Sequence, residues 1–240
     1  PEILGALVRA AQACHDMAVI YETPFISGKD SLHNEFEFEG KLTSIPHTLL
    51  ISAIGVMENT DKAVSMDFKG VGNSVYVVGT TQPELGGSAY FKAHGFTGNN
   101  VPKVNPQNAR ELMNSLSTAM EHGLVRACHD CSEGGLGVTL AEMAFAGGLG
   151  AEINLDSVPL GEPINREDFI LFAESNSRFV VEVSSRHRRR FEEIMNGLSF
   201  ARIGRVTGSE SLEVYGLNKS KIISVSLDEL KEAWQKPLRW

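Results

Sequence analysis

The stretch LVRACHDCSEGGLGVTLAEMAFA, residues 124–146, places a short strand, a glycine-rich turn and a helix in immediate succession. Residues 124–127 are a short apolar run that suits a strand, and a helix is expected from about Leu136 to Ala146. The two glycines between them leave backbone N–H groups free at the start of that helix. This succession predicts a fold in which strands and helices alternate.

The same alternation continues on both sides of this stretch. Strands are expected at 74–79, 151–155, 178–183, 201–206, 211–215 and 221–225. Helices are expected over 105–123 and 186–197, and three more are expected to begin near residues 88, 165 and 226. The pair Asn105-Pro106 is typical of a helix start. Interleaved strands and helices predict an α/β or α+β sandwich with mixed sheets rather than a bundle or a barrel.

The first sixty residues follow a different pattern. Residues 1–18 have helical apolar spacing, 19–26 are expected to be extended, and the apolar run PHTLLISAIGVM (46–57) predicts a strand covered on both faces. A polar, glycine-bearing stretch follows it. We therefore expect a domain over 1–60, a linker over 61–73 and a second domain over 74–240.

Composition excludes several classes of protein. The chain has 240 residues, 42% of them apolar and 22% charged, which is ordinary for a globular protein of one large or two small domains. A net charge of −8 argues against a nucleic-acid partner, and we interpret the basic run 186–190 as a solvated helix face. Neither a secretory leader nor a run of about 18 uncharged apolar residues is evident, so we expect no membrane segment.

Three cysteines are too few for a disulfide scaffold and indicate a reducing compartment. Cys128 and Cys131 form one C-x-x-C pair, but a structural zinc site needs a second pair of ligands. A redox dithiol expects a thioredoxin-like setting. We favour two small buried residues beside a functional turn, with metal and redox roles as alternatives.

The segment SGKDS (27–31), followed by His33-Asn34-Glu35, is the first of three candidate sites. Gly28 lets backbone N–H groups approach an anion, Lys29 supplies a positive charge, and carboxylates can hold Mg²⁺. A β-turn with a surface lysine explains the pattern about as well.

The other two candidates follow a predicted strand and a predicted helix. HDCSEGGL (129–136) offers N–H donors to an anion, and the alternative is a capped helix start with Ser132 as the cap. FAESNSR (172–178) combines an acid, hydroxyls, an amide and a base. The favoured interpretation of this third segment is a polar loop with an Arg178–Glu174 ion pair.

Taken in order, the segments SGKDSLHNE, LGGSAYF, HDCSEGGLGVTLAEMAF and LFAESNSRFVVEV resemble the second half of the phosphoribosylformylglycinamidine synthase family. This family lies in the superfamily of aminoimidazole ribonucleotide synthetase. The resemblance covers nearly the whole chain, and LDELKEAWQKPLRW is similar to the family's C-terminal end. It implies a partial N-type domain over 1–60 and a complete C-type α/β sandwich domain over 74–240.

The resemblance also implies a reaction and its cofactors. The family uses ATP and Mg²⁺ to activate the amide oxygen of formylglycinamide ribonucleotide, and glutamine-derived ammonia then displaces phosphate to give the amidine. The family residues most closely tied to catalysis lie in the first half, so we assign no catalytic residue here and expect this chain alone to be inactive.

Individual site residues carry over from the matching motif. Gly28 would approach ATP through its backbone, Lys29 or Asp30 would lie near phosphate or metal, and Ser31 would lie near substrate phosphate. Asp30 is the better Mg²⁺ ligand, because an ammonium group cannot coordinate a cation. Residues that could support this site indirectly, or belong to a vestigial one, are Asn34, Glu35, His129, Asp130, Ser132, Glu133 and Glu174.

The implied partners are the first half of the same synthase, a glutaminase subunit and a small bridging subunit, in the cytoplasm. Without a covering strand, the apolar surface of 49–56 is expected to promote self-association of this chain. Two alternatives stay open. The chain could be a non-catalytic nucleotide-binding or structural half, or it could come from another synthetase of the superfamily.

Overall fold

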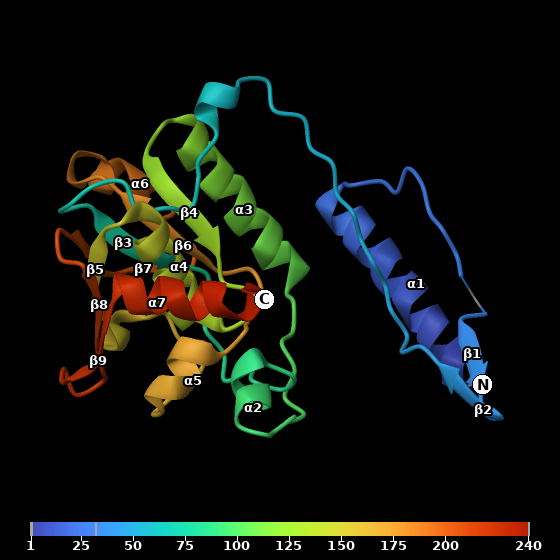
Figure 1. The fold of residues 1–240 in the computed structure, drawn as a ribbon. Helices are drawn as coiled ribbons and strands as arrows, with labels where there is room; N and C mark the ends of the chain where they lie inside the picture. The colour runs from blue at the N-terminus through green and yellow to red at the C-terminus, as the bar shows by residue number, and fades with distance from the viewer. Residues whose placement is uncertain (1, 32, 240) are drawn as a thin grey trace. The chain divides into compact units, whose positions relative to one another are not determined.

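A computed structural model describes residues 2–31 and 33–239 (Figure 1). The chain divides into two compact units, residues 1–58 and residues 59–240. Each unit is described by itself below.

The second unit is built on one seven-stranded mixed sheet. Its strand order is β4-β6-β3-β7-β5-β8-β9, with β5 and β8 parallel and the other neighbours antiparallel. The strands are β3 (Ser74–Val78), β4 (Val125–Asp130), β5 (Gly150–Asn154), β6 (Phe179–Val183), β7 (Phe200–Thr207), β8 (Ser211–Tyr215) and β9 (Lys221–Ser226). Every strand expected in this unit is present, with ends shifted by up to three residues.

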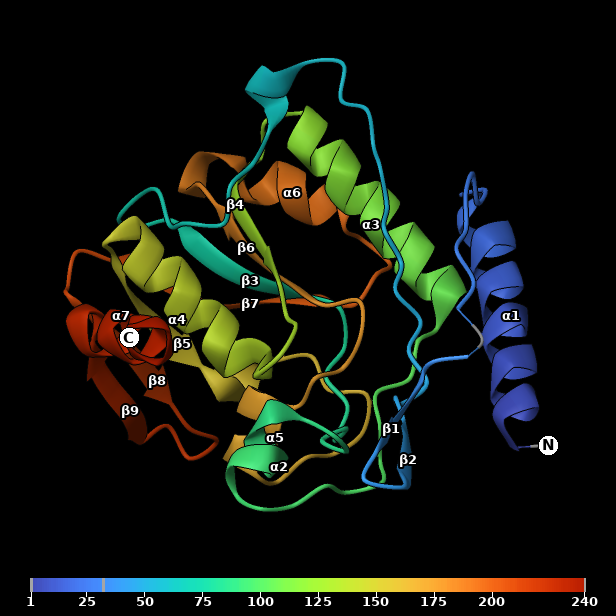
Figure 2. The same cartoon turned by 45° about the vertical axis from the view of Figure 1, so that its right-hand side comes forward.

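Both faces of this sheet are covered by helices (Figure 2). The α-helices of this unit are α2 (Ala89–Ala93), α3 (Pro106–Glu121), α4 (Gly135–Gly147), α5 (Glu167–Phe172), α6 (Arg188–Ile194) and α7 (Leu227–Gln235). Short 3-10 turns lie at η1 (Thr60–Lys62), η2 (Leu155–Ser157), η3 (Ser185–His187) and η4 (Lys236–Leu238).

The central strand β3 shows why the sheet is a middle layer. Val75 and Val77 pack into the core that contains α4, α5 and α7, whereas Tyr76 and Val78 pack into the core that contains α3 and α6. Alternate side chains of a strand point to opposite faces, and all five residues of β3 are buried. The predicted α/β sandwich with a mixed sheet is therefore confirmed.

Polar side chains fix the helix starts. Asn105 accepts the N–H of Asn108 at 3.2 Å at the start of α3, as the Asn-Pro pair predicts. Ser88 caps α2, and Ser226 forms a reciprocal capping box with Glu229 at the start of α7.

A buried carboxylate ties the entry of this unit to its sheet. Glu182 on β6 is fully buried and accepts the backbone N–H of Lys69 at 2.7 Å and of Gly70 at 3.0 Å. The side-chain amide of Asn73 also donates to it. Three donors satisfy the ionised group, which makes its burial tolerable.

The first unit has little buried surface. It contains α1 (Glu2–Tyr21) and a hairpin of β1 (Glu35–Phe38) and β2 (Lys41–Ser44), joined through Glu39 and Gly40 at φ 51° and 74°. The helix continues through 19–21, where an extended run is predicted, and the hairpin is not anticipated from the sequence. Left-handed Glu22, at φ 56°, ends the helix.

The strand predicted over 46–57 does not form. This segment is extended coil, with Leu50, Ile54 and Val56 at least 86% exposed. A strand requires a neighbouring backbone for its hydrogen bonds, and the ladder that the described residues of this unit form joins β1 to β2.

Residues 3–21 of α1 are long and apolar enough to cross a membrane by length and composition, contrary to the sequence-based expectation. The segment includes Arg9 and Asp16. A charged residue at the centre of a membrane helix raises the free energy of membrane insertion by about 2.5–3.5 kcal/mol, so Arg9 and Asp16 disfavour insertion of this helix.

Candidate functional site

The second and third candidate motifs meet in the second unit through Glu174. This residue follows α5, and its Oε1 accepts the N–H of Gly134 at 2.8 Å and the N–H of Ala89 at 2.9 Å. Gly134 precedes α4 and Ala89 begins α2. The carboxylate therefore takes the place that an external anion would occupy at these two helix starts.

Arg178 fixes the loop that carries Glu174. Its guanidinium is 1% exposed and donates to the backbone oxygens of Ser175 at 3.1 Å and Ala173 at 2.5 Å, and to the hydroxyl of Thr81 at 2.9 Å. Burial lowers the pKa of this guanidinium, and the nearby Cys131, Glu84 and Glu174 oppose that shift. The structure does not show the predicted Arg178–Glu174 ion pair as a direct contact: the guanidinium donates to the loop backbone and to Thr81, and the charge of Glu174 acts on it without a hydrogen bond.

The same loop approaches the end of β3 very closely. The Ser175 hydroxyl accepts the N–H of Gln82 at 2.9 Å and donates to the Gln82 carbonyl oxygen at 3.1 Å. Ser177 has φ 58°, and Gly79 has φ 100°. A Cβ at Gly79 would lie 2.5 Å from the Ser177 carbonyl oxygen. Only glycine fits at Gly79, and the loop is held in one conformation.

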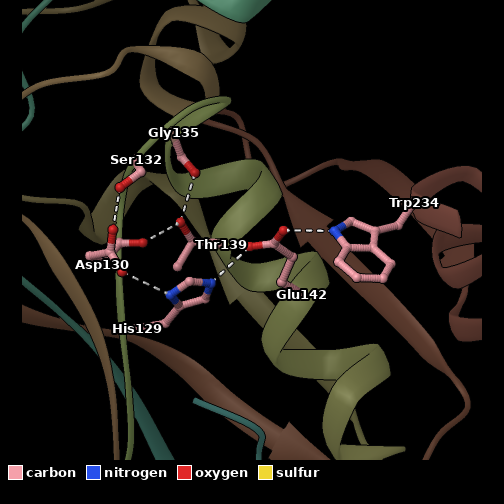
Figure 3. A network of polar contacts seen from close by, with 7 residues as sticks. All are labelled: His129, Asp130, Ser132, Gly135, Thr139, Glu142 and Trp234. Atoms are coloured by element: carbon pink, nitrogen blue, oxygen red, sulfur yellow. Dashed lines mark hydrogen bonds and ion pairs between the residues drawn. The ribbon is translucent and has the colours of Figure 1, made fainter. Parts of the chain in front are cut away.

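His129 lies between two carboxylates (Figure 3). Its Nε2 lies 2.8 Å from Oε2 of Glu142 on α4, and its Nδ1 lies 3.2 Å from Oδ1 of Asp130. Ser132 donates to the other Asp130 oxygen, and the Trp234 indole N–H donates to Oε1 of Glu142 at 3.1 Å. Each ring nitrogen of His129 is therefore within hydrogen-bond distance of one carboxylate oxygen.

Ser132 is not the cap of α4, contrary to the alternative drawn from the sequence. Its hydroxyl is bonded to Asp130, and the residue at the cap position is Gly134, at φ 81°. Gly135 is required by packing, because a Cβ there would lie 2.3 Å from the Ala173 carbonyl oxygen. Gly135 thus permits close contact with the segment after α5, whereas a Cβ at Gly134 would meet Val138 of α4.

Hydrogen bonding and burial shift the pKa of three groups in this turn. The Ser132 hydroxyl is the main cause of a lowered pKa at Asp130. Burial raises the pKa of the Cys128 thiol to about 12 and also raises that of Cys131. Both thiols are therefore protonated near neutral pH, which argues against a thiolate metal site or a redox dithiol here.

A cleft of about 630 Å³ opens beside this turn. Its charged lining residues are Asp130, Glu133, Glu174 and Arg178. The guanidinium of Arg178 is buried and used internally, so three carboxylates dominate the cleft. This charge disfavours a phosphate group, in contrast to the anion site suggested by the sequence.

The first candidate motif lies in the other unit and is exposed over 27–31. Lys29 Nζ donates to the Asp30 carbonyl oxygen at 2.9 Å and to the Ser31 hydroxyl at 3.2 Å. The Asn34 amide donates to the Ser31 carbonyl oxygen at 2.8 Å, and Glu35 accepts from Ser44 at 3.2 Å. These contacts are local.

This segment is open on the surface of its unit. Nothing lies within 4 Å of a Cβ built on Gly28, so no cradle surrounds it. Among residues 2–31 and 33–239, no group of three His, Cys, Asp or Glu side chains is placed to hold a metal ion. A Mg²⁺ ion takes near-octahedral oxygen coordination, so Asp30 could supply only part of its ligands.

Two residues of the His129 network, Glu142 and Trp234, were not anticipated. Glu142 is 13 residues from His129 and Trp234 is 92 residues from Glu142. Glu142 lies in a largely apolar helix and Trp234 in an amphipathic one. No local spacing indicates that these three side chains meet.

Comparison with known proteins places the fold. Residues 70–216 match the family model described as AIR synthase related protein, C-terminal domain. The chain belongs to this family. Among curated relatives, subunit PurL of phosphoribosylformylglycinamidine synthase from Alkaliphilus metalliredigens is 32% identical over 95% of this chain, and PurL from Moorella thermoacetica is 32% identical over 99%. The resemblance identified from the motifs is confirmed.

The chain spans about a third of the length of these relatives, 29% of the first and 31% of the second. Solved structures of PurL have the same fold as part of this chain. Thermotoga maritima PurL complexed with FGAR has a TM-score of 0.63 and 25% identity, over 71% of this chain and 30% of that one. E. coli HypE, a hydrogenase maturation protein, has a TM-score of 0.51 at 20% identity over 68% of this chain and 52% of that one, and shares the fold alone.

Proposed function

We propose that this chain is the C-terminal part of a PurL-type synthase subunit, an ATP-dependent ligase of purine biosynthesis. It would convert formylglycinamide ribonucleotide, ATP and glutamine-derived ammonia to formylglycinamidine ribonucleotide. The supporting observation is 32% identity to PurL subunits along 95–99% of the chain. A cytoplasmic location would follow from this role.

The Gly28–Ser31 segment would contribute to a nucleotide and Mg²⁺ site that other parts of the subunit complete. Structures of T. maritima PurL have been solved with ATP and with ADP. In this chain, Gly28, Lys29 and Asp30 are exposed and lack surrounding ligands, so they would act only once covered. Ser31 would lie near substrate phosphate.

The domain limits of 1–60, 61–73 and 74–240 belong to the same proposal. The N-type portion would need the rest of the subunit to bury its apolar side chains, whereas the second unit has its own two-sided core. Partner subunits would include a glutaminase and a small bridging protein. A complex named PurLQS is known from T. maritima.

A chimaera tests this function. The last third of M. thermoacetica PurL is replaced by this chain, and ADP formation is measured with ATP, Mg²⁺, ammonia and formylglycinamide ribonucleotide. We expect turnover by the chimaera and none by the 240-residue chain alone. Asp30→Asn is expected to reduce turnover at least tenfold, with Asp228→Asn on α7 as the matched control. A folded chimaera that binds substrate without turnover contradicts the proposal.

A second candidate function is that of a non-catalytic, structural half of the synthase. The hydrogen bonds of Glu174 favour a structural role for the 129–135 turn. Its carboxylate already bonds the N–H groups of Gly134 and Ala89, which a bound phosphate would need. On this account, His129, Asp130, Ser132 and Glu133 maintain the domain. Their substitution in the chimaera would then lower stability while leaving the KM for ATP unchanged.

A further inference from the structure

A second hollow in the 59–240 unit lies on the end of β3. It encloses about 330 Å³, and its walls come from residues 79–84, 103–112, 175–177 and 197–199. It shares only Asn176 and Ser177 with the acidic cleft beside the 130–135 turn. The motifs that indicated function do not include most of its residues.

Glu84 gives this cavity its chemistry. Its side chain is 6% exposed and lines the cavity, and its Oε1 accepts the N–H of Lys103 at 3.2 Å. Its Oε2 is buried and has no hydrogen-bond partner among residues 2–31 and 33–239. A buried carboxylate oxygen without a donor is unfavourable, so a donor from outside the chain is expected at this point.

The charge of the lining restricts what that donor can be. The lining residues include two carboxylates, Glu84 and the exposed Glu111, and one amine, that of Lys103, and the remaining polar side chains are amides and hydroxyls. The buried guanidinium of Arg178 lies near Glu84 behind this lining. This balance disfavours phosphates and nucleotides. No cluster of metal-ligating side chains occurs in the part of the chain that the structure describes, which disfavours a divalent metal.

The walls are already in place. Arg178 holds the 173–178 loop from inside, Ser175 bonds both backbone groups of Gln82, and the Thr80 hydroxyl donates to Ser199 at 2.8 Å. Ser177 is kept at φ 58°, a conformation that a non-glycine residue adopts when its surroundings impose it. A preformed cavity binds without an ordering cost.

We propose that this cavity binds a small molecule or ion bearing a primary ammonium group, with Glu84 Oε2 accepting one of its N–H groups. An ammonium group supplies the missing donor. The volume of about 330 Å³ accommodates a compact organic body attached to it. This site is independent of the proposed synthase activity.

Thermal unfolding of the 240-residue chain tests the proposal, because a ligand that binds only the native state raises its Tm. Ammonium chloride and ethylammonium chloride are compared with tetramethylammonium chloride at equal ionic strength. All three cations carry one charge, but the last has no N–H donor. We expect a saturable rise in Tm with one or both of the first two only. A response to ammonium alone identifies the ion, and a stronger response to ethylammonium identifies a larger amine.

Three variants sharpen the result. E84Q is expected to weaken the affinity about tenfold or more, as for loss of a charged hydrogen bond, whereas E210Q, at an exposed position outside the cavity, leaves it unchanged. K103M is expected to retain binding, and binding seen only in K103M would show that Lys103 already fills the site. If E84Q does not fold, the parent chain is titrated with the same cations and its backbone amide chemical shifts are followed by NMR. Changes at Gln82, Lys103 and Ser177 support binding in this cavity. Equal responses to all three cations, or shifts elsewhere, overturn the proposal.

Discussion

The indole N–H of Trp234 donates to Oε1 of Glu142 at 3.1 Å, and Oε2 of the same carboxylate lies 2.8 Å from His129. The last helix of the chain is thereby connected to the glycine-rich turn at the start of α4. Trp234 also packs against Phe145, with ring centroids 5.7 Å apart. One side chain therefore supplies both a hydrogen bond and apolar contact to α4.

Trp234→Phe separates these two contributions. It keeps an aromatic ring near Phe145 and removes the donor to Glu142, so we expect a loss of about 1 kcal/mol in the free energy of unfolding. Trp234→Leu, which also changes the ring packing, is expected to lose more. Urea unfolding measures both. Equal stability of Trp234→Phe and the parent chain would show that the indole hydrogen bond contributes nothing.

Removing Glu174 should create an anion site where the sequence suggests one. Glu174→Ala frees the N–H groups of Gly134 and Ala89 and leaves them without the carboxylate. We expect this variant to lose about 2 kcal/mol of stability and to regain part of it in phosphate. The comparison is Tm in phosphate and in chloride at equal ionic strength.

Glu133→Ala, in the same turn, is the matched control for that experiment. It leaves the Glu174 hydrogen bonds intact and should respond to phosphate as the parent chain does. If the parent chain is stabilised by phosphate as strongly as Glu174→Ala, the helix starts are open to anions and Glu174 does not occupy them.

Partial burial of Cys128 predicts that its thiol is alkylated slowly and that the chain loses stability at alkaline pH. Its pKa is raised to about 12 in the folded chain, against an unfolded value near 9. The unfolded thiol therefore ionises first, and the stability that this group contributes is present below pH 9 and lost as the pH rises towards 12. At pH 8 in a Cys14→Ser background, alkylation of the native chain should be at least about a hundredfold slower than that of the unfolded chain.

Cys128→Ser in the same background provides the control. It removes the titrating thiol, so its unfolding free energy should fall less steeply between pH 9 and 11. Rapid alkylation of Cys128 in the native chain at pH 8 would show that the thiol is accessible and ionised, contrary to its burial.

The sandwich domain could be predicted because its signals are local. The apolar run Val75–Val78 of β3, the Asn105-Pro106 pair and the Ser226–Glu229 capping box each specify an element through neighbouring residues. Family motifs then specified the order of these elements. The failure at 46–57 has the opposite cause, because an apolar run becomes a strand only when another backbone pairs with it.

The site was harder to predict because its contacts are long-range. The sequence indicates the His129 motif, but Glu142, which contacts His129, and Trp234, which donates to Glu142, lie on two separate helices. Ser132 donates to Asp130 and does not cap the helix. A long-range contact also bears on the anion-binding interpretation of the turn, which stays a prediction. Glu174, 40 residues away, already accepts the Gly134 N–H.

Glu182 offers a test of how the second unit is closed. Glu182→Gln replaces one acceptor oxygen by a donor that faces the backbone N–H groups of Lys69 or Gly70. We expect a loss of about 3 kcal/mol in unfolding free energy, since a buried group loses its partners. Glu210→Gln, at an exposed position, should change stability by less than about 0.5 kcal/mol. Comparable effects of the two substitutions would refute the role assigned to Glu182.

Exposed apolar side chains of the first unit predict self-association of this chain. Leu50, Ile54 and Val56 are 86%, 86% and 96% exposed, and both Phe36 and Phe38 are more than 60% exposed. Contiguous apolar surface is rarely left open to water on a soluble monomer. Sedimentation velocity between about 5 and 100 μM should therefore show concentration-dependent association. The variant with Leu50→Lys, Ile54→Lys and Val56→Lys is the full-length control, and it should associate more weakly because each lysine must be desolvated in the contact. A parent chain that sediments as a monomer throughout, or a triple variant that associates equally, would show that this surface is not the contact.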